Sequence, residues 1–255
     1  MVLAVFLLAV ASDASTIDLR SVPCASPKLV ELADFIAARR AMPLTCGPMS
    51  YGSGSGRNPR PPCAVAVTSA ELFAAPTPAP GEPPPLRPPP LSLDARRRRR
   101  ALMGALWLGC DMLDECHDLV GGDSGAGSDA AYLHALLHRR EGGCVGELGM
   151  TGWANSDYWW GVLGGGHPTH AQLAAATAAA LETAATPPSA RATAFAGAVE
   201  ARAAAGEAWD PCAFVALCRE ADEGDDPALA AFARELQHRE WELLFDRIVR
   251  SACDD

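Results

Sequence analysis

From residue 94 onward, helix-capping residues stand before one alanine-rich segment after another, and this pattern limits the fold more than any other feature. Asp210-Pro211 and Asp226-Pro227 each place a capping acid before a proline, which suits the first turn of a helix. Thr169 with Gln172 forms a capping box. Strand signals are nearly absent, and alanine is the best helix former. The sequence therefore predicts an all-α fold, an irregular helical bundle.

The expected helices follow from these caps and from glycine pairs that end helices. Asp94 is expected to cap one continuous helix that runs to about Val120 and ends at Gly121-Gly122. Ser128 caps a helix that ends at Gly142-Gly143. Residues 144–166 are glycine-rich and are expected to be irregular, apart from a turn at NSDYWWGVL. Later helices are expected to open after Thr169 and at Pro211, to span 189–205, and to run from 227 to about 252, the last being the longest.

A proline tract divides the chain into three parts. Residues 76–93 form a polyproline-II linker, because proline fixes φ and removes a backbone donor. A docking site for a proline-reading domain is the alternative interpretation of this tract. Before it lies a partly ordered N-terminal region, residues 1–75, with a short helix expected at 26–40. After it comes the helical domain, residues 94–253, so the bundle is expected to carry a disordered, proline-rich N-terminal segment.

The start of the chain bears on the compartment. Residues 2–11 are apolar and Ala9-Val10-Ala11 resembles a cleavage site, so residues 1–14 are a candidate signal peptide. A buried helix or strand of the fold is the favoured interpretation, so a cytoplasmic location is expected, with secretion as the alternative. The run is too short to span a bilayer, and no other segment is apolar enough. Nine cysteines without a CxxC pair indicate neither a zinc knuckle nor a disulfide framework, and most are interpreted as reduced thiols.

The charge balance excludes one class of partner. The net charge is −10 and the pI about 5.0, whereas nucleic-acid binding needs a basic surface. The one basic run, Arg96 to Arg100, is interpreted as a solvated helix start or linker, with a nuclear address or an anion patch as alternatives. The classes of partner that remain are a small-molecule ligand and another protein.

One predicted helix carries a candidate site. His134, His138 and Glu141 recur at i, i+4 and i+7, so all three point the same way. Two imidazoles and a carboxylate on one face can bind a divalent metal, or can supply a base and its orienting partner. With Arg139 and Arg140 beside them, they form the candidate catalytic set. Structural hydrogen bonding between helices is the alternative.

The preceding helix offers further ligands. Its core stripe is expected to contain Leu102, Leu106, Leu113 and Val120. His117 borders this stripe, which suits either a core histidine or a ligand. A solvated face opposite the stripe is expected to hold Asp111, Asp114, Glu115 and Asp118. If that face met the histidine face, then Asp114, Glu115 and His117 would join the metal set.

The last helix places a carboxylate within an apolar stripe. Glu240 lies among Leu229, Phe232, Leu236 and Leu243. A buried carboxylate must be paired or it becomes neutral. A bidentate clamp with Arg139 or Arg140 is the favoured interpretation, and a further metal ligand is the alternative.

An aromatic segment lies between these helices. WANSDYWWGVLGGGHP gathers Trp153, Tyr158, Trp159 and Trp160 beside glycines, with Asn155 and His167 nearby. Aromatic walls with a few polar groups can line a ligand pocket, and they can equally cover a core under an irregular loop. Asn155, Tyr158, Trp159, His167 and Glu240 are therefore the candidate ligand-binding residues.

These motifs in combination resemble a family of uncharacterised microbial all-helical proteins. The motifs are ALWLGCDMLDECHDLV, YLHALLHRREGG, NSDYWWGVLGGGHP, WDPCAFVALC and LQHREWELLFD, and they cover residues ~95 to 250. The resemblance implies a shared helical fold and shared polar positions, not a reaction. This chain departs from the pattern at Cys110, where the family has a histidine, and at 144–153, which look like an insertion.

The sequence leads to two functional hypotheses. The first is a metal-dependent enzyme, a hydrolase or an oxidoreductase, whose site is built from the histidines and acids above. The second is a non-catalytic helical binding or scaffold protein, in which the same histidines and arginines hold helices together.

Overall fold

The computed structural model describes residues 29–31, 92–122, 125, 127–146, 149–164, 166–184 and 187–253. Residues 29–31 are helical, within the helix expected at 26–40. The candidate signal peptide and nearly all of the expected linker lie outside the described residues. Within the described ranges the fold is all-α, and the one β feature is an isolated antiparallel bridge between Val145 and Thr151.

The described helices follow one another closely along the chain. They are α3 (Leu93–Gly109), α4 (Leu113–Val120), α5 (Asp129–Glu141), α6 (Gly152–Leu163), α7 (His170–Ala184), α8 (Ala190–Ala204), α9 (Pro211–Glu223) and α10 (Pro227–Cys253). As expected, the last is the longest of them, with 27 residues. None of the helices in the described part is both long and apolar enough to cross a bilayer.

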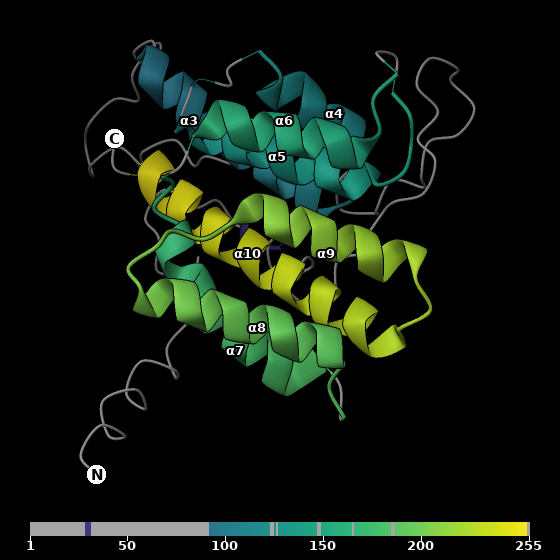
Figure 1. Ribbon diagram of the computed structural model, residues 1–255. Coiled ribbons are helices and arrows are strands. Elements are labelled where there is room, and N and C mark those ends of the chain that lie inside the picture. Colours follow the sequence, from purple (N-terminus) through teal and green to yellow (C-terminus); the bar gives the residue numbers. More distant parts are fainter. Residues whose placement is uncertain are drawn as a thin grey trace, which may run out of the picture.

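Helix α10 lies between two groups of helices (Figure 1). α3 to α6 lie on one side of it, α7 and α8 lie on the other, and α9 runs beside it. α10 packs directly against α3, α7, α8 and α9. The Trp241 indole N–H donates to the Ala105 carbonyl at 2.9 Å, which fixes α10 against α3. The long last helix is therefore the axis of the bundle.

The caps at Ser128, Asp210 and Asp226 form as expected. The Ser128 hydroxyl accepts from the Ala131 N–H, and the Asp210 carboxylate accepts from the Ala213 N–H. Asp226 Oδ1 accepts from two amides at the start of α10. Thr169 differs, because its hydroxyl has no hydrogen-bond partner among the described residues, so the capping box is absent although α7 begins where it was expected.

The prediction of a single helix from Asp94 to Val120 is wrong. Ser92, not Asp94, caps α3. This helix ends at Gly109, and a second helix, α4, starts at Leu113. At the break, Asp111 has a φ of 62°, in the left-handed region that few non-glycine residues adopt. Arg140 pairs with the Asp111 carboxylate and donates to the Leu108 carbonyl at 3.3 Å. A buried arginine from α5 thus occupies the gap.

The break changes the expected faces only in part. The core stripe is confirmed, since Leu102, Leu106, Leu113 and Val120 are all buried. Asp111 does not share a solvated face with the acids of α4, because it turns inward to Arg140.

The prediction that residues 144–166 are irregular is also partly wrong. Residues 152–163 form a helix of 12 residues, capped by the Thr151 hydroxyl, which accepts from the Ala154 N–H at 3.2 Å. The Ser156 hydroxyl donates to the Ala135 carbonyl at 2.8 Å, and Trp153 and Trp160 are buried. Tertiary burial of the two tryptophans outweighs the low helix propensity of the surrounding glycines.

A buried ion pair joins α5 to α10. Glu240 is fully buried, and its Oε2 accepts from Arg139 Nη2 at 2.5 Å. Its other oxygen accepts from the Tyr132 hydroxyl at 2.8 Å, while Arg139 Nε donates to Gln237 at 3.1 Å. The expected clamp therefore exists through Arg139, but it is not bidentate, because Tyr132 takes the second carboxylate oxygen. Arg140 is not part of it.

The rest of the α10 stripe departs from expectation at one position. Leu229, Phe232 and Leu236 are buried, but Leu243 is only partly buried, and Leu244 is buried instead. Leu244 lies four residues after Glu240, so it continues the buried face by one turn.

We predict that Glu240→Gln lowers the free energy of unfolding by about 3 kcal/mol, because it leaves the Arg139 guanidinium buried without a countercharge. Denaturant unfolding measures this loss. Glu223→Gln is the control, since Glu223 pairs with Arg219 on the surface and such pairs contribute less than about 1 kcal/mol. Equal stability of the Glu240 variant and the wild type would contradict the role assigned to the pair.

Candidate metal centre

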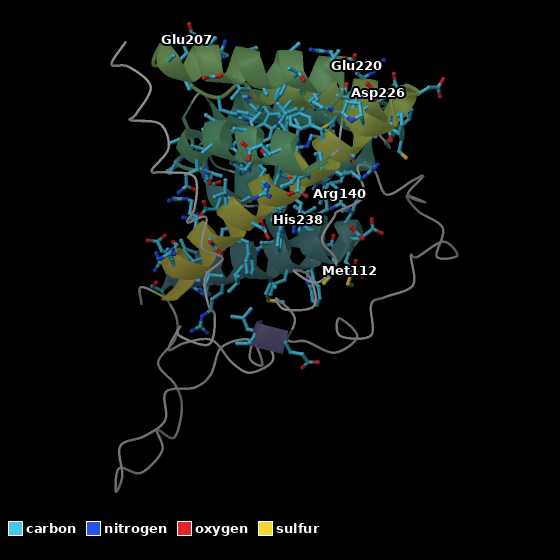
Figure 2. All side chains as sticks on the ribbon, turned by 90° about the horizontal axis from the view of Figure 1, so that it is seen from below. Met112, Arg140, Glu207, Glu220, Asp226 and His238 are labelled. Carbon is cyan, nitrogen blue, oxygen red and sulfur yellow. The ribbon has the colours of Figure 1, made fainter. Side chains whose placement is uncertain are left out.

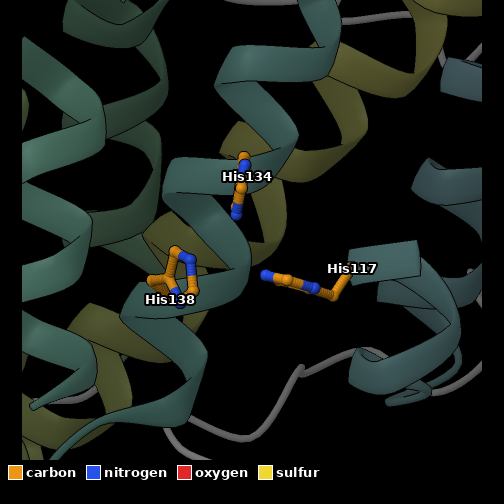
Figure 3. Close-up of side chains that lie close together, drawn as sticks. All are labelled: His117, His134 and His138. Carbon is orange, nitrogen blue, oxygen red and sulfur yellow. The ribbon is translucent and has the colours of Figure 1, made fainter. Parts of the chain in front are cut away.

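Three histidines meet between α4 and α5. His134 and His138 occupy successive turns of α5, and His117 reaches toward them from α4 (Figure 3). Each offers one ring nitrogen such that the three nitrogens lie within 4.8 Å of one another. Their ring centroids are separated by 4.7 Å (His134–His138), 4.9 Å (His117–His134) and 5.6 Å (His117–His138).

The neighbours of His138 leave one of its ring nitrogens free for a ligand. Its Nδ1 lies 2.6 Å from Glu141 Oε2, so the Nδ1–H donates to this carboxylate. The Asn155 amide nitrogen lies 3.1 Å from Nδ1 and 3.2 Å from Nε2. An atom that close to both nitrogens lies over the ring face, because in the ring plane it would overlap the carbon between them. The in-plane lone pair of Nε2 is therefore free, and Glu141 fixes the tautomer that exposes it.

His134 has no hydrogen-bond partner among the described residues. Both of its ring nitrogens are buried, and the side chain stacks on Trp159 with 3.9 Å between ring centroids. Burial, with the charges of His138 and His117 adding to it, lowers the pKa of His134 to about 3. The imidazole is thus neutral at physiological pH and carries an unused lone pair, an uncommon state for a buried polar group.

The carboxylates expected in the ligand set lie at its edge. Asp114 is exposed and Glu115 half-buried, and neither belongs to the group of three close ligand atoms. Although Asp114 is exposed, partial desolvation by its surroundings raises the pKa of its carboxyl, and the nearby charges of Glu115, Asp118 and Glu141 raise it further. Glu141 is buried, but it binds the Nδ1–H of His138 and is not one of the three close ligand residues.

The other candidate residues are divided between this site and the rest of the molecule. Asn155 and Trp159 contact the histidines from α6, whereas Tyr158 is 58% exposed and touches the site only through Trp159. His167 lies elsewhere, where its Nε2–H donates to Asp129 at 3.0 Å. Glu240 and Arg139 belong to the ion pair between α5 and α10. Arg140, labelled in Figure 2, pairs with Asp111 at the joint between α3 and α4.

Two residues near these groups were missed by sequence reasoning. Asp129 binds both His167 and Arg247 of α10, and its place in the first turn of α5 carries no signal beyond that of an ordinary helix start. His170 is buried, and neither of its ring nitrogens has a hydrogen-bond partner in the described part of the chain. The i, i+3 spacing of His167 and His170 was the one signal that could have drawn attention to it.

Searches of protein-family models, of curated proteins and of solved structures find nothing that matches this chain. The resemblance of its motifs to a helical family therefore carries no activity to this site, and the function has to be argued from the geometry.

A close approach between α5 and α6 positions the site. A Cβ atom on Gly152 would lie 2.5 Å from the His138 carbonyl oxygen and 2.6 Å from Glu141 Cβ. Those atoms are backbone or close to it, so they cannot move aside without shifting α5 or α6. Glycine at this position lets α6 bring Asn155 and Trp159 against the two α5 histidines.

We predict that Gly152→Ala lowers the free energy of unfolding by about 1–3 kcal/mol, because the extra methyl group overpacks the α5–α6 contact. Gly161→Ala is the matched control on the same helix. Nothing lies within 4 Å of its added Cβ, so it is expected to stabilise by about 0.5–1 kcal/mol through helix propensity. Thermal unfolding of the two variants tests the contrast. Variants with the same stability would show that α5 and α6 are not in close contact.

Proposed function

We propose that this protein binds one divalent transition-metal ion between His117, His134 and His138, and that it is a metal-dependent hydrolase. The observation that carries the proposal is the pair of unpartnered, buried nitrogens of His134, placed among two other imidazoles. A metal would satisfy a lone pair that no described residue satisfies in this position.

The donor set suits a transition metal. Imidazole is a ligand for zinc, copper, iron and nickel, whereas magnesium and calcium prefer oxygen. Glu141 on His138 Nδ1 supports this choice, because metal-bound histidines commonly donate their other N–H to a carboxylate. Three protein ligands are typical of catalytic zinc sites, which keep one position open.

The chemistry follows from the charge of the site. A metal held by these three imidazoles would supply Lewis acidity toward water and toward carbonyl or phosphoryl groups. Asp114 lies within electrostatic range of both His117 and Glu141, and the pKa of its carboxyl is raised, so it is our candidate for the group that would accept a proton. His117 is half-buried, so the site opens on the α4 side. Oxidoreductase chemistry is the alternative if the bound metal is iron or copper.

A scaffold role is the second candidate, and one observation favours it. Every residue from Ala131 to Gly142 is buried, and its polar members join α5 to α3, α6 and α10. In that case the histidines would contribute to stability alone.

We predict near-stoichiometric metal in untagged protein, measured by elemental mass spectrometry, and its loss in the His134→Asn, His138→Gln double variant. The cause is the removal of two of the three ligands. His238→Gln is the control, since His238 pairs with Glu242 on α10 outside the site. A scaffold role instead predicts no metal in the wild type, even after incubation with zinc, iron or manganese, and a large drop in the melting temperature of the double variant.

We also predict that Glu141→Gln weakens metal binding by about 10–100-fold while the site still fills at high metal concentration. The amide keeps the size of the side chain but accepts the His138 proton less strongly. Competition with a chromophoric chelator measures the affinity, and exposed Glu182→Gln serves as the control. An unchanged metal affinity in Glu141→Gln would show that Glu141 does not contribute to the metal site.

A further inference from the structure

Helix α4 carries acidic side chains on the face from which His117 reaches the histidine centre. Asp114, His117 and Asp118 lie at i, i+3 and i+4, so they share one side of α4. From this side His117 points toward His134 and His138 (Figure 3). Both aspartates are exposed, whereas His117 is half-buried. A molecule that approaches His117 from solvent on this side therefore meets two carboxylates.

The two aspartates are not neutralised within the described part of the chain. Neither Asp114 nor Asp118 forms an ion pair with a residue that the structure describes. Partial desolvation raises the pKa of the Asp114 carboxyl, and the charges of three nearby carboxylates raise it further, those of Glu115, Asp118 and Glu141. The carboxylates are thus close enough for their charges to repel one another. Such a group attracts a cation and opposes an anion, and the net charge of −10 acts in the same sense at longer range.

Two aromatic rings border the same centre from α6. Trp159 stacks on the His134 ring with 3.9 Å between centroids, and His117 contacts that ring in a T-shaped arrangement at 4.9 Å. The acidic side of α4 and the aromatic side of α6 therefore meet at one imidazole. Tyr158 is 58% exposed and lies T-shaped against the half-buried Trp159 at 5.4 Å. An ammonium ion is attracted both by carboxylates and by the faces of aromatic rings.

An unpartnered side chain lies where the two sides meet. His134 is 2% exposed, and neither of its ring nitrogens has a hydrogen-bond partner among the described residues. Buried polar atoms of this kind are rare and indicate a missing partner, which the proposed function identifies as a metal. A divalent ion would add two positive charges, fewer than the negative charges of the four carboxylates nearby. The surroundings of the loaded centre would thus still favour a cation.

We propose that the substrates of this metal centre are small organic cations, molecules that carry an ammonium group, and not phosphates or carboxylates. The ammonium group lies between the aspartates of α4 and the Trp159 ring. This inference rests on the proposed function, because it names the substrate class of the same site. It favours a carbonyl compound over a phosphate ester, since phosphate esters are anions at neutral pH.

The test compares two probes of the same shape, the cation 2-hydroxyethyltrimethylammonium and its uncharged counterpart 3,3-dimethylbutan-1-ol. Each has a single methyl resonance, so saturation-transfer NMR on the full-length protein follows both in the same way. We expect saturable binding of the cation, with a Kd at least about tenfold lower than that of the neutral probe. Added salt should weaken the binding of the cation alone. The metal content of the same sample is measured by elemental mass spectrometry.

Variants on the two sides of the centre locate the binding. Asp118→Asn should weaken binding of the cation several-fold and leave the neutral probe unaffected. Asp225→Asn is the matched control at another exposed position, and it should bind as the wild type does. Trp159→Leu should also weaken binding of the cation, because it removes the ring face but keeps an apolar side chain. If circular dichroism shows that Trp159→Leu does not fold, Tyr158→Leu takes its place and must give a loss in the same direction.

The inference is overturned by equal binding of the two probes, by unchanged binding in Asp118→Asn, or by stronger binding of the anion 3,3-dimethylbutanoate than of the cation. Its failure is distinguishable from failure of the metal centre. Selective binding of the cation to protein that takes up no metal, even after incubation with zinc, would support the cation site and overturn the metal-dependent function. Stoichiometric metal without preference for the cation would do the reverse.

Discussion

The ion pair of Arg139 with Glu240 is the interaction on which the rest of this bundle depends. Both side chains are fully buried, so removal of either partner would leave the other as an uncompensated charge in the core. Tyr132 and Gln237 complete the hydrogen bonding, and the guanidinium lies over the Phe214 ring at 4.5 Å. Although burial alone would lower the pKa of Arg139, the charge of Glu240 raises it. The pair fixes the register between α5 and α10, because a shift of one residue would leave a buried charge alone.

The four residues His138 to Glu141 then connect α5 to its surroundings in different directions. His138 faces α4 and α6, Arg139 faces α10, and Arg140 enters the joint between α3 and α4. Glu141 turns back to His138. Because consecutive residues on a helix are about 100° apart, a polar run of this kind can bond to several neighbouring helices at once. The histidine site is thus held by a helix that is fixed on its other faces.

The sequence predicted much of the fold, and it did so through local chemistry. Ser128, Asp210 and Asp226 act as caps because an N-cap needs only its own helix start. The alignment of His134 with His138 and the burial of Glu240 also followed from helical spacing. The break at Asp111 was not predictable, because its cause is an arginine from another helix. Helix α6 was missed because glycines lower helix propensity, whereas packing of Trp153 and Trp160 decides the outcome. The exclusion of Asp114 and Glu115 from the histidine group likewise depends on how α4 turns after the break.

The burial of α5 from Ala131 to Glu141 has a consequence for how the protein opens. Beyond its partly exposed first turn, this helix has no solvent face, so no further part of it can fray while the remainder stays packed. Its backbone amides should therefore exchange with deuterium only when the whole bundle unfolds, so their protection would equal the global stability. The surface helix α8, in which Ala192 and Phe195 are the buried residues, should exchange through much smaller openings. The cooperative core of this protein is therefore expected to be organised around α5.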